Sequence, residues 1–198
     1  ELGLEEDTMS FDISAGCSGF LYGIKICKGL LENSTKPYAL LIGSEQLSRM
    51  VDFTDRQTCV LFGDGAGAAI LKLSDEHPYY QRVWSDGNDE ALVCLGPGNW
   101  PAKLKMDGQA VFRFAVRVCK QGIDQILEDS QLSFDQIDYV LCHQANERII
   151  DYVKKKYDLP DEKFFMNLQK YGNTSSASIP MAIDEMTESG MIHPGTKI

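Results

Sequence analysis

The stretch FDISAGCSGFLYGIKICKGLLE, residues 11–32, decides how the rest of the chain is interpreted. Residues 10–14 form a short apolar run typical of a strand, and 17–32 have the apolar pattern of a helix. The helix is apolar on several sides, which predicts a central position. Small residues surround Cys17, so little bulk shields its sulfur. We also expect the unpaired N–H groups at the helix start to lower the pKa of this thiol.

Short apolar runs alternate with longer helical patterns along the rest of the chain. This order predicts an α/β fold with buried strands. Besides the first strand and helix, we expect strands at 38–44 and 139–142 and helices at 108–129, 146–157 and 175–189. Residues 78–101 mix β-like pieces with glycine, asparagine and proline, which predicts short strands and loops. We place a domain boundary near residue 77, between regions 1–77 and 78–198.

Composition limits the class of protein. The 198 residues are 43% hydrophobic and carry a net charge of -10, which favours a packed core and opposes non-specific binding to nucleic acid or anionic lipid. No apolar run is long enough for a membrane span and no basic leader precedes one, so we expect a cytoplasmic protein without a membrane partner. The six cysteines have no metal-ligand spacing, and no metal site is expected.

Two further polar residues lie where chemistry is possible. His143, in CHQANERIID, follows the strand expected at 139–142, and Asn173, in YGNTSSASIP, precedes the last helix. A thiol in a bend of small residues and a histidine after a strand are the partners that acyl-transfer chemistry needs. Each residue alone also has an ordinary explanation, as a buried cysteine, a core histidine or a turn asparagine.

Three segments together, DISAGCSGF, HQANERI and GNTSSASIP, resemble the β-ketoacyl-acyl-carrier-protein synthase III family of the thiolase superfamily. The separations, 126 residues from Cys17 to His143 and 30 from His143 to Asn173, are similar to those of the family. DFTDRQTCVLFGDGAGAAIL and MDGQAVFRFAVRV extend the resemblance over nearly the whole chain.

For the fold, the resemblance implies a thiolase-like architecture, layered α/β with mixed sheets and a buried central helix. The family has further segments before the nucleophile helix and after the last helix, so we expect the chain to be incomplete at both ends. Residues 1–77 would then be the C-terminal part of the first thiolase-like half, and 78–198 most of the second.

For the reaction, the resemblance implies that Cys17 takes an acyl group from a short acyl-CoA and passes it to a carbanion. Malonyl-acyl carrier protein supplies that carbanion by losing carbon dioxide, and fatty acid synthesis begins. His143 and Asn173 would stabilise the negative charge on the thioester oxygen, as oxyanion-hole donors do. Acyl-CoA is a substrate, so no cofactor is expected, and a homodimer is implied.

The resemblance also gives roles to residues outside the catalytic three. Arg56 matches an arginine that packs on the CoA adenine, and Phe62 matches a phenylalanine near the acyl pocket. A basic surface that docks the acidic carrier protein is matched by Arg113, Arg148, Lys155 and Lys156. Solvated surface charge is the ordinary explanation for such cations.

Three alternatives remain open at this level. The first is a non-catalytic thiolase-like fragment that serves as a binding or assembly module. The second is a chalcone-synthase-like enzyme, which keeps the same Cys, His and Asn. The third is a dinucleotide-binding protein, because Gly63, Gly65 and Ala68 fit a G-x-G-x-x-A pattern with Asp86 about 20 residues on. The segment after these glycines is too short for a crossover helix, so we expect them to permit tight backbone packing instead.

Overall fold

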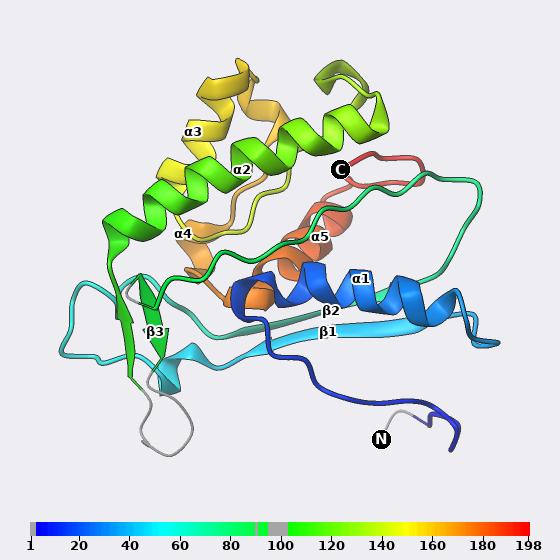
Figure 1. The fold of residues 1–198 in the computed structure, drawn as a ribbon, viewed down its shortest axis with the longest axis horizontal. Helices are drawn as coiled ribbons and strands as arrows, with labels where there is room; N and C mark the ends of the chain where they lie inside the picture. The colour runs from blue at the N-terminus through cyan, green and yellow to red at the C-terminus, as the bar shows by residue number, and fades with distance from the viewer. Residues whose placement is uncertain (1–2, 90, 95–102) are drawn as a thin grey trace.

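A computed structural model describes residues 3–89, 91–94 and 103–198 of the chain. An antiparallel sheet of two strands, β1 (Ala39–Glu45) and β2 (Gly65–Leu71), lies at its base, paired in register from Ala39 opposite Leu71 to Glu45 opposite Gly65. One face of this sheet is covered by α1 (Gly19–Leu31), which packs on β1, and α5 (Ser178–Glu188), which packs on β2 (Figure 1).

A second layer lies beyond these helices. The long helix α2 (Gly108–Ser130) packs beside α3 (Glu147–Tyr157), and the short helix α4 (Leu168–Tyr171) leads back toward the sheet (Figure 1). A small antiparallel pair, β3 (Leu92–Cys94) and β4 (Leu104–Met106), precedes α2. The core of this layer is formed by Ile150, Val153 and Phe164, against which side chains of α2 pack.

Local signals explain why the helices of this layer begin where they do. The Asp107 carboxylate accepts hydrogen bonds from two backbone N–H groups in the first turn of α2, and the Asn146 side chain caps α3 in the same way. Such caps satisfy N–H groups that have no partner within the helix. The helices expected at 108–129 and 146–157 are confirmed, and the expected strand at 38–44 differs from β1 by one residue at each end.

Two expected strands are wrong. Residues 10–14 and 139–142, all of them described, form no β-ladder. In the second segment the Tyr139 N–H donates to the Lys197 carbonyl at 3.2 Å and the Val140 N–H to the Lys163 carbonyl at 2.7 Å. An apolar run becomes a strand only when a neighbouring strand supplies the ladder. The two sheets of the described residues are also antiparallel rather than mixed. Of the strands expected within 78–101, β3 is present, whereas the β-like piece at 79–84 forms no strand; residues 90 and 95–101 lie outside the described residues.

The position of the Cys17 helix also differs from the expectation. Cys17 lies in a 3-10 turn, η1 (Gly16–Ser18), and α1 follows it. This helix buries Phe20 and Leu31 but leaves Leu21 43% exposed, because only one face of it meets β1. The buried helix of the described structure is α5, whose Ala182 and Met186 are completely buried.

The sheet shows why α5 lies so close to it. Side chains of β1 and β2 alternate between the covered face and an open face that exposes Leu40, Ile42 and Ile70. On the covered face, a Cβ atom at Gly43 would lie 2.9 Å from the Ser176 carbonyl oxygen, so glycine lets the start of α5 approach the strand.

No described helix has the length and apolarity needed to cross a membrane. The boundary near residue 77 stays a prediction.

Candidate active site

Cys17 is presented by a turn that only glycine adopts easily. Gly16 has a φ of 52°, in the left-handed region, and the turn leads directly into α1. The Cys17 side chain is half-buried, and η1 packs against a second 3-10 turn, η5 (Ser175–Ala177), at the start of α5. The thiol therefore lies between the amino ends of two helices.

Asn173 is held by its backbone beside this thiol. Its N–H donates to the Leu61 carbonyl at 2.8 Å, and its carbonyl accepts from the Gly63 N–H at 3.0 Å, an isolated parallel bridge centred on Phe62. The side-chain Oδ1 accepts from the Ser175 N–H at 2.9 Å. The amide N–H group is thus left to interact with the Cys17 sulfur, and that interaction lowers the pKa of the thiol.

The net pKa of Cys17 nevertheless moves opposite to the sequence prediction. Burial raises it, interactions with the Ser175 and Asn173 side chains lower it, and the negative charge of Glu45 raises it again, with a raised pKa as the result. The predicted lowering by the helix start is wrong because desolvation opposes the charged thiolate more strongly. Cys17 is therefore a thiol at neutral pH and must lose its proton when it attacks a substrate.

His143 is a neutral imidazole that is hydrogen-bonded to the side chain at the start of α5. Its Nδ1 lies 2.5 Å from the Ser178 Oγ, and burial lowers its pKa to about 4. Nε2 is buried without a hydrogen-bond partner among the described residues. Buried polar atoms are rarely left unpaired, so an unused Nε2 indicates a place where a ligand atom binds.

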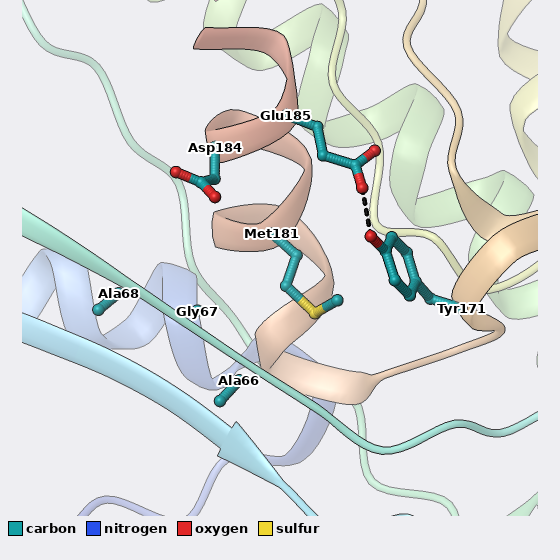
Figure 2. A pocket seen from close by; sticks show the side chains of 7 residues that line it. All are labelled: Ala66, Gly67, Ala68, Tyr171, Met181, Asp184 and Glu185. Atoms are coloured by element: carbon teal, nitrogen blue, oxygen red, sulfur yellow. Dashed lines mark hydrogen bonds between the residues drawn. The ribbon is translucent and has the colours of Figure 1, made fainter. Parts of the chain in front are cut away.

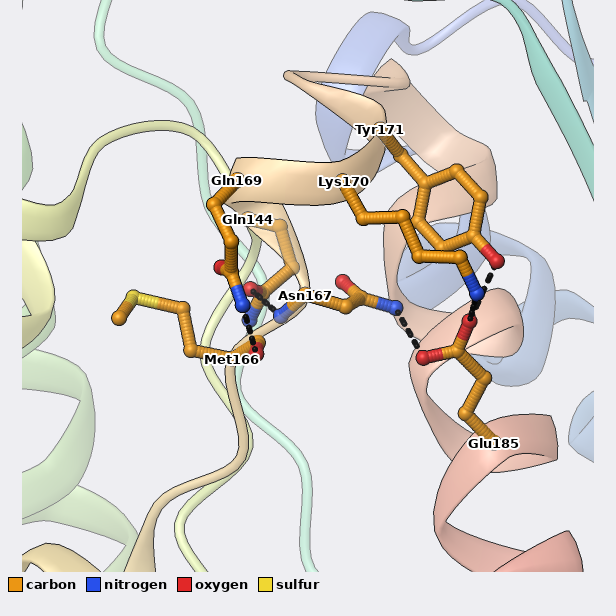
Figure 3. Close-up of polar contacts among 7 residues, drawn as sticks. All are labelled: Gln144, Met166, Asn167, Gln169, Lys170, Tyr171 and Glu185. Atoms are coloured by element: carbon orange, nitrogen blue, oxygen red, sulfur yellow. Dashed lines mark hydrogen bonds and ion pairs between the residues drawn. The ribbon is translucent and has the colours of Figure 1, made fainter.

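Gln144 fixes the backbone next to His143. Its side chain is 1% exposed; Nε2 donates to the Cys142 carbonyl at 2.9 Å and the Phe165 carbonyl at 3.3 Å, and Oε1 accepts from the Asn167 N–H at 3.1 Å. The Asn167 side chain continues to Glu185 on α5, as Figure 3 shows. This network joins the histidine loop to the same helix that carries Ser178.

The three predicted catalytic residues thus meet at one segment, 173–178. Asn173 belongs to it, Cys17 interacts with Asn173 and Ser175, and His143 is bonded to Ser178. The sequence interpretation missed Glu45, Ser175, Ser178 and Gln144 as neighbours of the site. Ser175 has a φ of 52°, a costly conformation for serine that is often found at functional sites. The run of hydroxyl side chains in GNTSSASIP was the available signal for both serines.

The other predicted site residues lie in different places. Phe62 is opposite Asn173 in the β-bridge, so it borders the site, whereas Arg56 is exposed in the loop that precedes it. Four cations lie exposed on α2 and α3 and take part in none of the ion pairs among the described residues: Arg113, Arg148, Lys155 and Lys156. Their roles in binding CoA, acyl chain and carrier protein stay predictions.

The glycines of the G-x-G-x-x-A pattern serve packing, as expected. A Cβ atom at Gly63 would lie 2.0 Å from the Tyr171 carbonyl oxygen, and one at Gly65 would lie 2.6 Å from the Met181 sulfur. The pattern runs into strand β2 rather than a helix. A dinucleotide site of this kind needs a helix N-terminus at the pyrophosphate, so this interpretation is excluded.

A separate pocket lies beside α5. It measures ≈ 260 Å³ and lies between β2 and α5, lined by Ala66, Gly67, Ala68, Tyr171, Met181, Asp184 and Glu185 (Figure 2). Tyr171 donates to the Glu185 carboxylate within it. Cys17, His143 and Asn173 do not line this pocket, and it is smaller than most sites for drug-sized ligands. The candidate active site is therefore distinct from it.

Comparisons with known proteins identify the family to which the chain is similar. Residues 11–86 match the family described as 3-oxoacyl-[acyl-carrier-protein (ACP)] synthase III, and residues 127–198 match its C-terminal family. The chain is 46% identical over 205 residues to the β-ketoacyl-[acyl-carrier-protein] synthase III of Clostridium botulinum, covering 97% of this chain and 63% of that protein.

Solved structures give the same result for the fold. The crystal structure of 3-oxoacyl-[acyl-carrier-protein] synthase III from Aquifex aeolicus has a TM-score of 0.86 and 37% identity, over 96% of this chain and 62% of that one. The corresponding protein of Pseudomonas aeruginosa also has a TM-score of 0.86, with 33% identity over 94% of this chain and 60% of that one. The described architecture is therefore thiolase-like, and the chain spans about 63% of the length of the curated relatives it matches.

Proposed function

Because the chain belongs to the β-ketoacyl-acyl-carrier-protein synthase III family, we propose that it carries the catalytic residues of a decarboxylative condensation. The substrates would be a short acyl-CoA and malonyl-acyl carrier protein, and the product would start fatty acid synthesis. The observation that carries the proposal is the meeting of Cys17, Asn173 and the anchor of His143 at segment 173–178.

In the first half-reaction, the Cys17 sulfur attacks the carbonyl carbon of the acyl-CoA thioester. The bond from that carbon to the CoA sulfur breaks, and the departing CoA thiolate takes up a proton equivalent to the one that Cys17 loses. The raised pKa of Cys17 works against this step, because the thiolate is the nucleophile, and the interactions with the Ser175 and Asn173 side chains partly offset it. No hydrogen bond joins His143 to Cys17 among the described residues, so we do not assign His143 the role of base in this step.

In the second half-reaction, the malonyl thioester loses carbon dioxide and its electron pair forms an enolate. The negative charge develops on the thioester oxygen, where N–H groups of His143 and Asn173 would donate hydrogen bonds. The enolate carbon then attacks the acyl-Cys17 carbonyl, the carbon–sulfur bond breaks, and the released Cys17 thiolate takes a proton from solvent. A neutral imidazole fits this role, since its pKa of about 4 keeps it uncharged at neutral pH.

Residues outside the catalytic three have proposed roles in binding the substrates and the carrier protein. We propose that Arg56 contacts CoA, that Phe62 lines the acyl pocket, and that the cations of α2 and α3 attract the acidic carrier protein. The net charge of -10 makes a local positive surface necessary for rapid encounter with an acidic partner. We also propose that the protein forms a homodimer.

Separate assays of the two half-reactions test the function. Incubation with radiolabelled acetyl-CoA should leave a stable thioester on the protein, and Cys17→Ser should abolish it. His143→Ala should still accept the acyl group but fail to decarboxylate malonyl thioester. The matched control is Cys27→Ser, which changes a second half-buried cysteine that lies on α1, outside the site. This variant should label normally.

The same assays separate the alternatives. Absence of any thioester in the longest natural polypeptide that contains these residues would favour a binding or assembly module instead. Equal loss of both half-reactions in His143→Ala would contradict the division of roles between the two residues.

A further inference from the structure

We propose that Ser178 is a positioning residue whose hydroxyl holds His143 in the tautomer that carries its proton on Nε2. The inference rests on the proposed function, in which His143 donates from Nε2 to the thioester oxygen. Its basis is a short contact: the Ser178 Oγ lies 2.5 Å from the His143 Nδ1, and the serine is 2% exposed. At that depth water does not compete for the hydroxyl.

The donors and acceptors around the Ser178 hydroxyl show which group donates in this contact. The Ser178 Oγ accepts from the Gln144 backbone N–H at 3.4 Å, and a hydroxyl has one proton to donate. Among the described residues, the His143 Nδ1 is the one acceptor in contact with that hydroxyl. If Nδ1 carried the ring proton, two N–H groups would point at the Ser178 Oγ and the hydroxyl proton would be buried without an acceptor. The satisfied arrangement has the Ser178 O–H donating to Nδ1.

The neighbouring glutamine keeps this geometry in place. The Gln144 side chain makes three hydrogen bonds to backbone groups in its own loop and in the segment around Phe165, and it is 1% exposed. The backbone N–H that contacts Ser178 therefore belongs to a fixed loop. Serine at the first position of α5 and histidine at the end of that loop are held from both sides.

The tautomer matters because of what the other ring nitrogen does. In a neutral imidazole one nitrogen donates and the other accepts, so an accepting Nδ1 leaves the proton on Nε2. Nε2 is the buried atom without a partner in the described part of the chain. With the opposite tautomer, a lone pair on Nε2 would face the negative oxygen of the enolate and raise the barrier that it should lower.

The tautomer is measured directly by ¹⁵N NMR on protein labelled at histidine, because protonated and unprotonated ring nitrogens have well separated chemical shifts. The chain has three histidines, so the signal lost in His143→Ala identifies the residue. We expect the Nε2–H form in the wild type, a mixture with the Nδ1–H form in Ser178→Ala, and the wild-type form in Ser178→Thr, which keeps the hydroxyl.

Kinetics of the same variants connect the tautomer to the chemistry. In Ser178→Ala we expect malonyl-thioester decarboxylation to fall about 10-fold, less than the roughly 100-fold or larger effect of deleting an oxyanion donor, while acylation of Cys17 is unchanged. Ser178→Thr should restore decarboxylation. Ser189→Ala, which removes a hydroxyl bonded to the Met186 carbonyl at the other end of α5, should leave both the tautomer and the rates at their wild-type values.

A wild-type signal with the proton on Nδ1 would overturn the inference, as would a Ser178→Ala tautomer identical to that of the wild type. The wild-type spectrum needs no variant to fold, so the inference stays testable if Ser178→Ala is unstable. A shifted tautomer in Ser178→Ala together with a wild type that does not decarboxylate malonyl thioester would support the positioning role and refute the proposed function.

Discussion

Segment 173–178 and the outer faces of α2 and α3 contain the two kinds of residue that the proposed function needs, and they are held in opposite ways. Asn173 and Ser178 are 7% and 2% exposed and have fixed hydrogen-bond partners. Lys155 and Lys156 are exposed and form no ion pair among the described residues. Short-range donors act only from a fixed position, whereas charge acts over several ångströms from a mobile side chain.

The largest expected effect comes from changing one donor in the buried segment. Asn173→Asp keeps the Oδ1 that accepts from the Ser175 N–H but replaces the amide N–H group by an acceptor. We expect malonyl-thioester decarboxylation to fall about 100- to 1000-fold, the loss found for a deleted oxyanion-hole donor. Release of carbon dioxide in a single turnover measures this step.

Asn146→Asp is the matched control for that change. Asn146 caps α3 by accepting from the Arg148 N–H, and aspartate caps a helix equally well. This variant should keep wild-type decarboxylation. A rate within a few-fold of the wild type in Asn173→Asp would remove Asn173 from the proposed oxyanion site.

The two regions also differ in how far sequence alone predicted them. Helices α2 and α3 were predicted from their helical apolar patterns, which are local features of the sequence. The strand expected at 139–142 was wrong, since a ladder depends on a partner elsewhere in the chain. The direction of the Cys17 pKa was missed for the same reason: burial and the charge of Glu45 are products of the tertiary fold.

An intermediate effect is expected from the titration of His143. Burial lowers its pKa to about 4, against an ordinary value of 6.5. Between these two pH values the unfolded chain binds a proton that the folded chain does not. The free energy of unfolding should therefore fall as the pH falls from 6.5 toward 4, by up to about 1.4 kcal/mol per pH unit for this group.

Urea unfolding between pH 4 and pH 8 (about the range of histidine titration) measures this contribution. His143→Gln should reduce the slope of stability against pH, because the variant has no imidazole to protonate in the unfolded state. His193→Gln changes an exposed histidine and should keep the wild-type slope. Identical slopes in His143→Gln and the wild type would mean that the ring is not desolvated as described.

The smallest expected effect lies on the exposed face of α3. Lys155→Glu should slow association with an acidic carrier protein about 3- to 10-fold at low ionic strength, because steering depends on the local positive charge. Stopped-flow association should show this difference disappearing near 1 M salt, where the Debye length is about 3 Å. Lys25→Glu changes an exposed lysine on α1 by the same charge and should slow association less. Equal slowing by both variants would mean that net charge, rather than the α2–α3 face, governs the encounter, while the buried segment would keep its role in either case.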